Sequence, residues 1–224
     1  VNGAAGGVAG IAGLFAFNIV SDDALVVLGD GTTAGAAQIN GVLSESLVQD
    51  GDPVTVPASS GQQTRIKSFA SSTVDGYGGS VGIGGTAGVG AVSSTSLIES
   101  TAITRVDSSS VGAANLIDID AEAEINLRSY FAGLGGGFVG GAATVGVNIL
   151  KSQALVELRG ANISGGGFTS VTNFQEGAID IDALVTTNST SFVGAIAGGV
   201  VGLGGPLNVN DYDTTSKVNV IPSL

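Results

Sequence analysis

The chain has no cysteine, histidine, methionine or tryptophan among its 224 residues. Without cysteine and histidine it cannot build a thiolate or imidazole zinc site, and it cannot form disulfides. The side chain that most often serves as a general base and the cysteine nucleophile are also absent. These absences argue against an enzyme, and we expect no catalytic, cofactor-binding or metal-binding residues.

Basic and aromatic residues are also scarce. The chain has seven lysines and arginines and 19 aspartates and glutamates, which give it a formal net charge of −12. Aromatic residues make up 5% of the chain. Nucleic-acid binding rests on cationic contacts with phosphate, so this charge argues against it. It also makes binding to an anionic membrane surface a poor prediction. It is typical of a solvated extracellular surface, and it leaves open a loosely bound calcium ion.

Glycine supplies 38 residues, and hydrophobic residues make up 43% of the chain. With so few aromatics, the core must be built from valine, isoleucine, leucine and alanine. A thin, regular interior of this kind is typical of stacked-strand solenoids. The chain begins at Val1 in a glycine–alanine run without the basic region of a signal peptide, and we expect it to be a segment of a longer chain.

A glycine-rich signature recurs along the chain at unequal intervals. Each copy is followed, always at the same distance, by a short alternating segment, and this constant offset indicates a true repeat. The signatures are Gly6–Gly10, Gly84–Gly88, Gly136–Gly140 and Gly198–Gly202. The alternating segments are Ala24–Leu28, Ala102–Val106, Ala154–Leu158 and Ser216–Val220. The unequal intervals predict insertions in loops between coils.

A third element lies upstream of two signatures. Ile117–Ala121 recurs as Ile179–Ala183, at the interval that also separates the last two signatures, and Ile66–Ala70 is a weaker counterpart with a one-residue slip. A polar break before each alternating segment, such as Lys151–Gln153, predicts a polar turn. At about 20 residues per solenoid coil, each repeat would hold two to four coils.

Residues 117–128 alternate without a fault between apolar and polar side chains. This period of two predicts a strand with one buried face, because a helix would spread the same residues around its circumference. The glycine runs at 3–20, 131–150 and 192–207 are apolar enough to suggest membrane helices. They lack basic flanks and an aromatic belt, so we favour solenoid strands and keep a glycine-rich membrane-inserting protein as an alternative.

The best-defined repeat runs from Val147–Ile149 through Ala154–Leu158 and Gly160–Gly166 to Ile179–Ala183. In this order of motifs the chain resembles the repeats of very large secreted bacterial adhesins, the filamentous-haemagglutinin-like and leukotoxin-like proteins. The resemblance implies a right-handed parallel β-helix on the bacterial cell surface, extracellular and without catalytic residues. It also implies partners that are copies of itself, adjoining repeats, or receptors on host cells, matrix or neighbouring cells.

The whole chain, 1–224, is therefore expected to be a single repetitive β-solenoid segment with lateral loop insertions. Residues 32–64, with Pro53 and Pro57, depart from the repeat and are interpreted as an inserted loop or lateral hairpin. The expected function is a structural stalk or fibre segment of an adhesin. This expectation includes self-assembly of the segment into filaments.

Carboxylates are the remaining candidates for chemistry. Asp118 and Asp120 match Asp180 and Asp182 in the repeat, and stacked rows of them would repel or take up calcium. We expect instead that intervening coils separate them. A polysaccharide-cleaving β-helix enzyme, with a carboxylate pair as acid and base, is the catalytic alternative. Four oxygen-rich residues near the end are expected to form a turn: Asn208, Asn210, Asp211 and Asp213.

Overall fold

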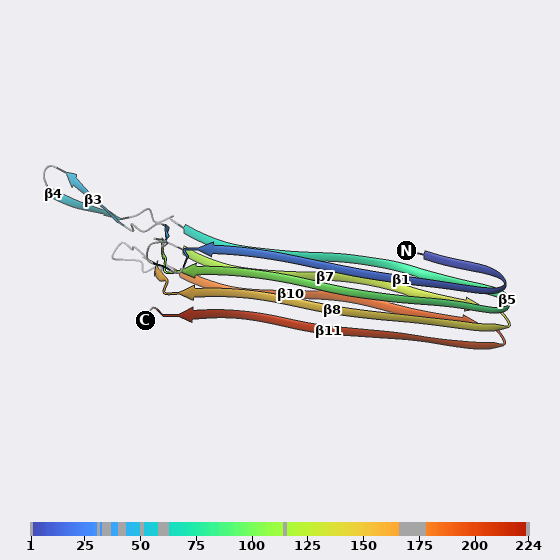
Figure 1. The fold of residues 1–224 in the computed structure, drawn as a ribbon. Helices are drawn as coiled ribbons and strands as arrows, with labels where there is room; N and C mark the ends of the chain where they lie inside the picture. Colours follow the sequence, from blue (N-terminus) through green and yellow to red (C-terminus); the bar gives the residue numbers. More distant parts are fainter. Residues whose placement is uncertain are drawn as a thin grey trace.

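The computed structural model describes residues 2–30, 32, 37–39, 44–49, 52–57, 63–113, 116–165 and 178–222. Within these residues the protein consists of β-strands and connecting turns, with no helix, so the expected all-β class is confirmed. The long strands, drawn in Figure 1, are β1 (Asn2–Leu28), β5 (Gln63–Asp107), β7 (Leu116–Gly136), β8 (Val139–Arg159), β10 (Ala178–Gly198) and β11 (Val201–Ile221).

Each coil of the chain runs out along one arm and back along another. β7 leads out, the chain turns at 137–138, and β8 leads back; β10 and β11 repeat this path. β5 contains both arms, because 63–83 pair with β7 and 87–107 pair with β8. We call these the outgoing and return arms, the tight turns between them the turn end, and the opposite end the loop end (Figure 1).

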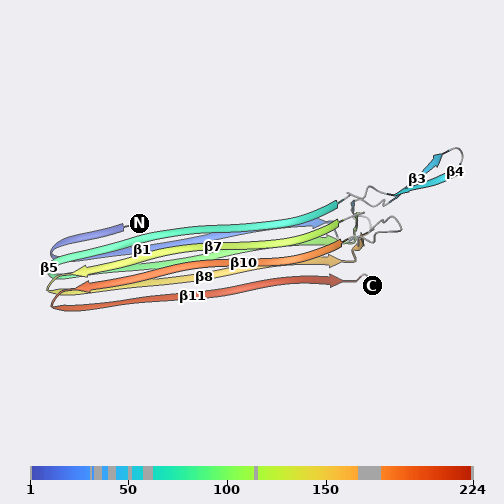
Figure 2. The same cartoon turned by 180° about the vertical axis from the view of Figure 1, so that it is seen from behind.

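The coils stack with every long strand parallel to its neighbours, as expected for a β-solenoid. The outgoing arms lie in the order β10-β7-β5, and the return arms in the order β1-β5-β8-β11. Side-chain hydrogen bonds join the two layers, such as Ser100 Oγ to the Ala70 carbonyl at 3.1 Å. Figure 2 shows the long stack of arms from behind. A 21-residue arm at roughly 3.3 Å per residue spans about 70 Å.

On the return arms, equivalent positions of the repeat lie directly beside one another. Ala24, Ala102, Ala154 and Ser216 form one row across the four arms. On the outgoing arms Ile117 pairs with Ile179, its counterpart in the next repeat. The weaker counterpart behaves differently: Ile66 pairs with Ile119 and not with Ile117. The longer turn of β5 accounts for one residue of this two-residue shift, because residues 84–86 separate its arms but 137–138 suffice between β7 and β8; the slip in the sequence match accounts for the other.

Two expectations about the coil were wrong. Each repeat holds one coil and not two to four, because the coil is built from two arms of 21 residues each. The polar breaks are not turns, because residues 151–153 continue β8 without interruption. Polarity misled the prediction: Lys151 and Gln153 face outward, while Ser152 lies in the interior.

The interior changes character along the arms. Near the loop end, isoleucine, valine, leucine and alanine fill it, as Ile117, Ile119 and Val156 do without any exposure. In the middle it is polar, and Ser129 Oγ donates to Ser191 Oγ at 2.9 Å. Toward the turn end, glycine takes the inward positions because the two layers converge. A Cβ at Gly135, for example, would overlap the Gly141 carbonyl.

The three glycine runs lie in extended chain. Residues 3–20 belong to β1, and the other two runs extend through β7 and β8 and through β10 and β11. In the part of the chain described above, no helix has the length and hydrophobicity needed to cross a membrane. The signature glycines therefore mark the turn end of each coil.

At the loop end the return arm turns sharply into a short strand. The backbone takes a left-handed conformation at Gly29 (φ 84°), Ser108 (φ 48°) and Gly160 (φ 56°). Three short parallel strands follow, β2 (Gln38–Ile39), β6 (Ser110–Ala113) and β9 (Asn162–Gly165). Between β2 and β5 lies an antiparallel pair, β3 (Ser44–Gln49) and β4 (Asp52–Pro57), within the stretch interpreted as a loop or hairpin.

The turn end provides a test of the close approach between coils. Gly199 has a φ of +147°, and a Cβ there would overlap the Gly137 carbonyl oxygen. We expect Gly199→Ala to lower the free energy of unfolding by about 2–4 kcal/mol. The adjacent Gly198 has open space around its Cβ position, so Gly198→Ala should change stability by less than about 1 kcal/mol. Urea unfolding of both variants compares them; equal losses would contradict the close packing.

Candidate functional site

The outer face of the outgoing layer carries directly adjacent rows of carboxylates. Asp118 pairs with Asp180, and Asp120 pairs with Asp182, with no coil between them. The expectation that intervening coils separate these acids was wrong, because the chain from Asp118 to Asp180 makes one coil and not several. Neighbouring parallel strands are only about 4.8 Å apart, so the carboxylates of each row repel one another.

Basic side chains of β5 complete the same rows. Arg65 lies beside Asp118 and Lys67 beside Asp120. Arg65 Nε is 3.0 Å from Asp118 Oδ2, and Lys67 Nζ is 2.5 Å from Glu122 Oε2. The sequence alone did not associate these cations with the acids, because Ile66 was matched to Ile117 and not to its observed partner Ile119. An alignment that allowed for the longer turn of β5 would have found them.

Two carboxyl groups in these rows have raised pKa values. Burial, a hydrogen bond with Asp118 and the negative charges of Asp118 and Asp182 raise the pKa of Asp120 to about 6, although Lys67 opposes the shift. The negative charge of Asp182 raises the pKa of Asp180 above its ordinary value of 3.8. The hydrogen bond with Glu122 raises the pKa of Lys67. The cluster therefore takes up a proton at a higher pH than an isolated aspartate would, below about pH 6.

A shallow hollow of about 260 Å³ lies over these rows, lined by residues that include Lys67, Asp120, Glu122 and Asp182. Its rim combines one cation with several carboxylates, so it suits a cationic or hydrogen-bonding ligand better than an anion. The described residues contain no group of three or more side chains placed to hold a metal ion. Loose calcium binding stays a prediction.

The repulsion within the rows predicts an unusual pH response. The pKa of Asp120 is raised from 3.8 to about 6 on folding, so this group stabilises the fold as the pH falls from about 7 toward 4. Asp120→Asn should remove that dependence and, after allowance for solvent screening, raise stability at pH 7 by about 1 kcal/mol. Asp75→Asn is the control and should give no gain, because Asp75 lies beside Arg128. Urea midpoints from pH 4 to 8 measure both.

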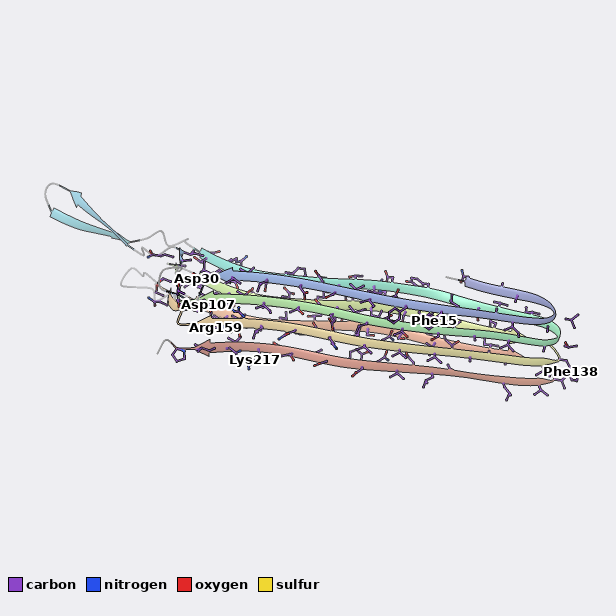
Figure 3. All side chains as sticks on the ribbon, in the orientation of Figure 1. Phe15, Asp30, Asp107, Phe138, Arg159 and Lys217 are labelled. Carbon is purple, nitrogen blue, oxygen red and sulfur yellow. The ribbon has the colours of Figure 1, made fainter. Side chains whose placement is uncertain are left out.

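A second charged cluster closes the loop end of the return layer, where Figure 3 labels Asp107 and Arg159. Arg105 pairs with Glu157, and Asp107 pairs with Arg159, so charges alternate across β5 and β8. Glu157 is 7% exposed, and its Oε2 accepts hydrogen bonds from Arg105 Nε and Arg159 Nη2, both at 2.8 Å. Burial alone would raise the pKa of Glu157, but these two hydrogen bonds lower it.

This buried carboxylate stabilises the fold above its ordinary pKa of 4.5, and the contribution is lost as the pH falls through the lowered value. Glu157→Gln should therefore cost about 1–3 kcal/mol at pH 7, because it removes the nearer of the two carboxylates that Arg105 and Arg159 share and leaves only Asp107, 3.9 Å from each Nε. The matched control is Glu99→Gln in the same strand pair. Glu99 is 3.2 Å from Lys151 at an exposed position, so its loss should cost less than about 1 kcal/mol. Urea unfolding at pH 7 and pH 4 distinguishes them.

Aromatic side chains form a further outward row on the outgoing layer. The rings of Tyr77 and Tyr130 stack with centroids 5.5 Å apart and planes 5° from parallel, and Phe192 is next in register. Because the two tyrosine rings cover each other's faces, they contribute mainly to the adhesion between coils. The sequence carries a signal for this row, because an aromatic residue recurs at the same repeat position in consecutive coils.

The oxygen-rich residues near the end of the chain do not form a turn. Asn208, Asn210, Asp211 and Asp213 lie within β11, paired with β8. The two asparagines occupy inward positions, and Asn148 Nδ2 donates to Asn210 Oδ1 at 2.8 Å. The turn prediction failed because polar residues were read as turn formers, whereas here the asparagines lie in an interior row and Asp211 and Asp213 lie at outward positions of the same strand.

The stacked parallel arms, with like residues in rows, define a β-solenoid type of architecture. Comparison with known proteins adds no relative: no family model, no curated protein and no solved structure matches the chain.

Proposed function

We propose that this chain is a structural segment of a secreted adhesin on the bacterial cell surface, a right-handed parallel β-helix with lateral insertions that forms part of a stalk or fibre. The observation that supports the proposal best is the continuous in-register stacking of arms of about 20 residues through consecutive coils. Such stacking repeats without limit along one axis, because each coil needs only its neighbours for stability.

The composition agrees with a passive, exposed role. The fold is held by aliphatic rows, hydrogen-bonded polar rows and backbone ladders, which need no disulfide or cofactor. A net charge of −12 keeps a large exposed surface solvated. The resemblance to large secreted adhesin repeats supports the extracellular location, and receptors on host cells, matrix or neighbouring bacteria are the proposed partners.

The loop end is the proposed presenting edge. Connections between coils leave the stack there, and they differ in length: β2 ends at Ile39 and β5 begins at Gln63, whereas β6 ends at Ala113 and β7 begins at Leu116. Ile39 pairs with Val111 and Gln63 pairs with Leu116, so stretches of very different length join the same two positions of the coil. Sequence at this edge can therefore vary for binding without disturbing the stack.

A loop replacement tests the proposal. In this variant residues 42–62 are replaced by Ala-Asn, the pair that stands at 114–115 between β6 and β7. We expect a thermal unfolding midpoint within a few degrees of the parent and a β-rich circular dichroism spectrum, because the coil path is preserved. Beads coated with the variant should bind cells several-fold less than beads coated with the parent.

The control is the outward substitution Leu203→Asp at the turn end, where residue 203 is 73% exposed and far from the presenting edge. It should leave bead binding unchanged. Parent-coated beads that bind no better than uncoated beads, on any of host cells, matrix proteins and bacteria, would contradict an adhesive role.

A further inference from the structure

The outer face of the return layer is apolar along its turn-end half. The outward positions of β8 there are Gly141, Ala143, Val145, Val147 and Ile149, and charge begins at Lys151. Each position continues as a row across the four return arms, so five outward rows lie side by side. We call these five rows the apolar face and name each row by its residue in β8. The polar members of the face are Ser93, Thr95 and Asp211.

The apolar face is both large and exposed. Phe15, labelled in Figure 3, is 70% exposed, and Leu207 in the same row is 55% exposed. Four arms at about 4.8 Å and five rows at about 6.6 Å cover roughly 19 Å by 33 Å, or about 600 Å². An exposed apolar patch of more than a few hundred Å² marks an interaction surface.

The periodicity of this face indicates what covers it. Its side chains recur every 4.8 Å or so along each row, because each coil adds one member. A partner can pack against such rows over several coils only if its own side chains have the same period. A second stack has that period, and paired sheets of identical chains form dry interfaces in this way. Two such faces bury about 1,200 Å² in total, which is enough for a stable interface.

We propose that two copies of the chain pack through their apolar faces, with their stack axes parallel and the arms of one copy antiparallel to those of the other. The two-fold axis runs along the stack through the row of Val145, so that each return arm faces its own counterpart. The proposal rests on the fibre role proposed above and names the partner of this face.

Side-chain sizes on the two copies are complementary about this axis. The row of Ala143 has only glycine or alanine in all four arms. It faces the bulkier row of the second copy, which consists of Phe17, Thr95, Val147 and Val209. A Cβ at Gly13 or at Gly205 would meet nothing within 4 Å, so the space over these glycines is empty. Bulky side chains therefore enter the hollows between the rows, as they do between packed sheets.

The charges agree with the same arrangement. Lys151, 3.2 Å from Glu99, lies in the first row beyond the apolar face and would face Val139 of the second copy at the rim. Asp211, at a corner of the face, would lie opposite Leu203. No two charged residues of the face or of this rim row stand opposite each other, and a polar rim around an apolar centre is typical of protein interfaces. The acidic rows of the outgoing layer stay on the outside of the pair.

Antiparallel arms leave both loop ends free. Residues 139–151 of β8 overlap the same residues of the second copy, and 152–159 extend beyond its turn end. The pair therefore has a loop end along each of its two long edges. Each further coil of a fibre adds another strip of the same contact, because the rows continue along the stack.

Association is measured by sedimentation velocity over a hundredfold range of concentration. The parent should sediment faster as concentration rises. Val145→Asp places two carboxylates opposite each other on the two-fold axis, so it should weaken association by about tenfold or more. The matched control is Val81→Asp, an outward position in the same half of the outgoing layer, which should stay within about twofold of the parent. Circular dichroism checks that both variants keep the parent fold.

A parent that stays monomeric throughout would overturn the contact and would leave this face to another partner. Equal losses in the two variants, or a larger loss in Val81→Asp, would also overturn it.

Chemical cross-linking tests the antiparallel direction, and the chain has no cysteine of its own. A mixture of Val139→Cys and Lys151→Cys chains should give dimers with a short thiol-specific cross-linker. Neither variant alone should do so, because its two thiols would lie about 40 Å apart in the pair. Dimers from Val139→Cys alone would place the two turn ends together and would overturn the proposed arrangement.

The two proposals fail separately. If a monomeric parent still binds cells through the loop end, the adhesive role stands and only the contact between copies is lost. If the copies pair in the expected direction but no bead binds, the contact stands and the adhesive role is lost.

Discussion

The whole structure depends on in-register parallel stacking at about 4.8 Å, which places each residue directly between its counterparts in the neighbouring coils. Every side chain must therefore tolerate a similar side chain above and below it. Alanine over alanine, isoleucine over isoleucine and tyrosine over tyrosine meet this condition without cost. Aspartate over aspartate does not, and Asp118 and Asp120 obtain relief from Arg65 and Lys67 in the adjoining coil.

The same constraint explains why the strands and the repeat itself could be predicted. The offset between signature and alternating segment is constant because both lie on one return arm, and the arm cannot change length without breaking its rows. The alternation at 117–128 indicated the inward and outward faces of β7 directly. A strand stacked in this way requires an alternating pattern of side chains and a constant spacing between its motifs, and both can be read from the sequence.

The size of the coil could not be predicted in the same way. A serine or asparagine in the interior looks like a turn residue unless its partner on the facing layer is known. Ser152 and Asn210 were misread for this reason, and the coil was divided into pieces that were too short. The acidic rows were missed as a consequence, because their adjacency depends on the coil being one whole repeat long. The cations beside them were missed because Ile66 was matched to Ile117, two residues from its observed partner Ile119, and the longer glycine turn of β5 contributes one residue of that shift.

The interior narrows along the arm, and this allows a very long arm to be packed by a chain that has few bulky side chains. Aliphatic residues separate the layers at the loop end, hydroxyl and amide groups bridge them in the middle, and glycine lets the backbones meet at the turn end. Phe131 shows how closely the coils are fitted, because its ring occupies the space left by Gly76 and Gly78 of the neighbouring coil. A wide coil is thus stabilised by three different kinds of contact along its length.

The spacing of the coils also limits how the loop end can meet another molecule. Connections from successive coils emerge only about 4.8 Å apart along the stack, whereas a folded domain of about 100 residues is roughly 30 Å across. Any protein that docks there must cover the connections of several coils at once. The surface to which such a protein binds is then made of several unlike loops. The number of proteins bound per unit length is set by the size of the bound protein and not by the number of coils.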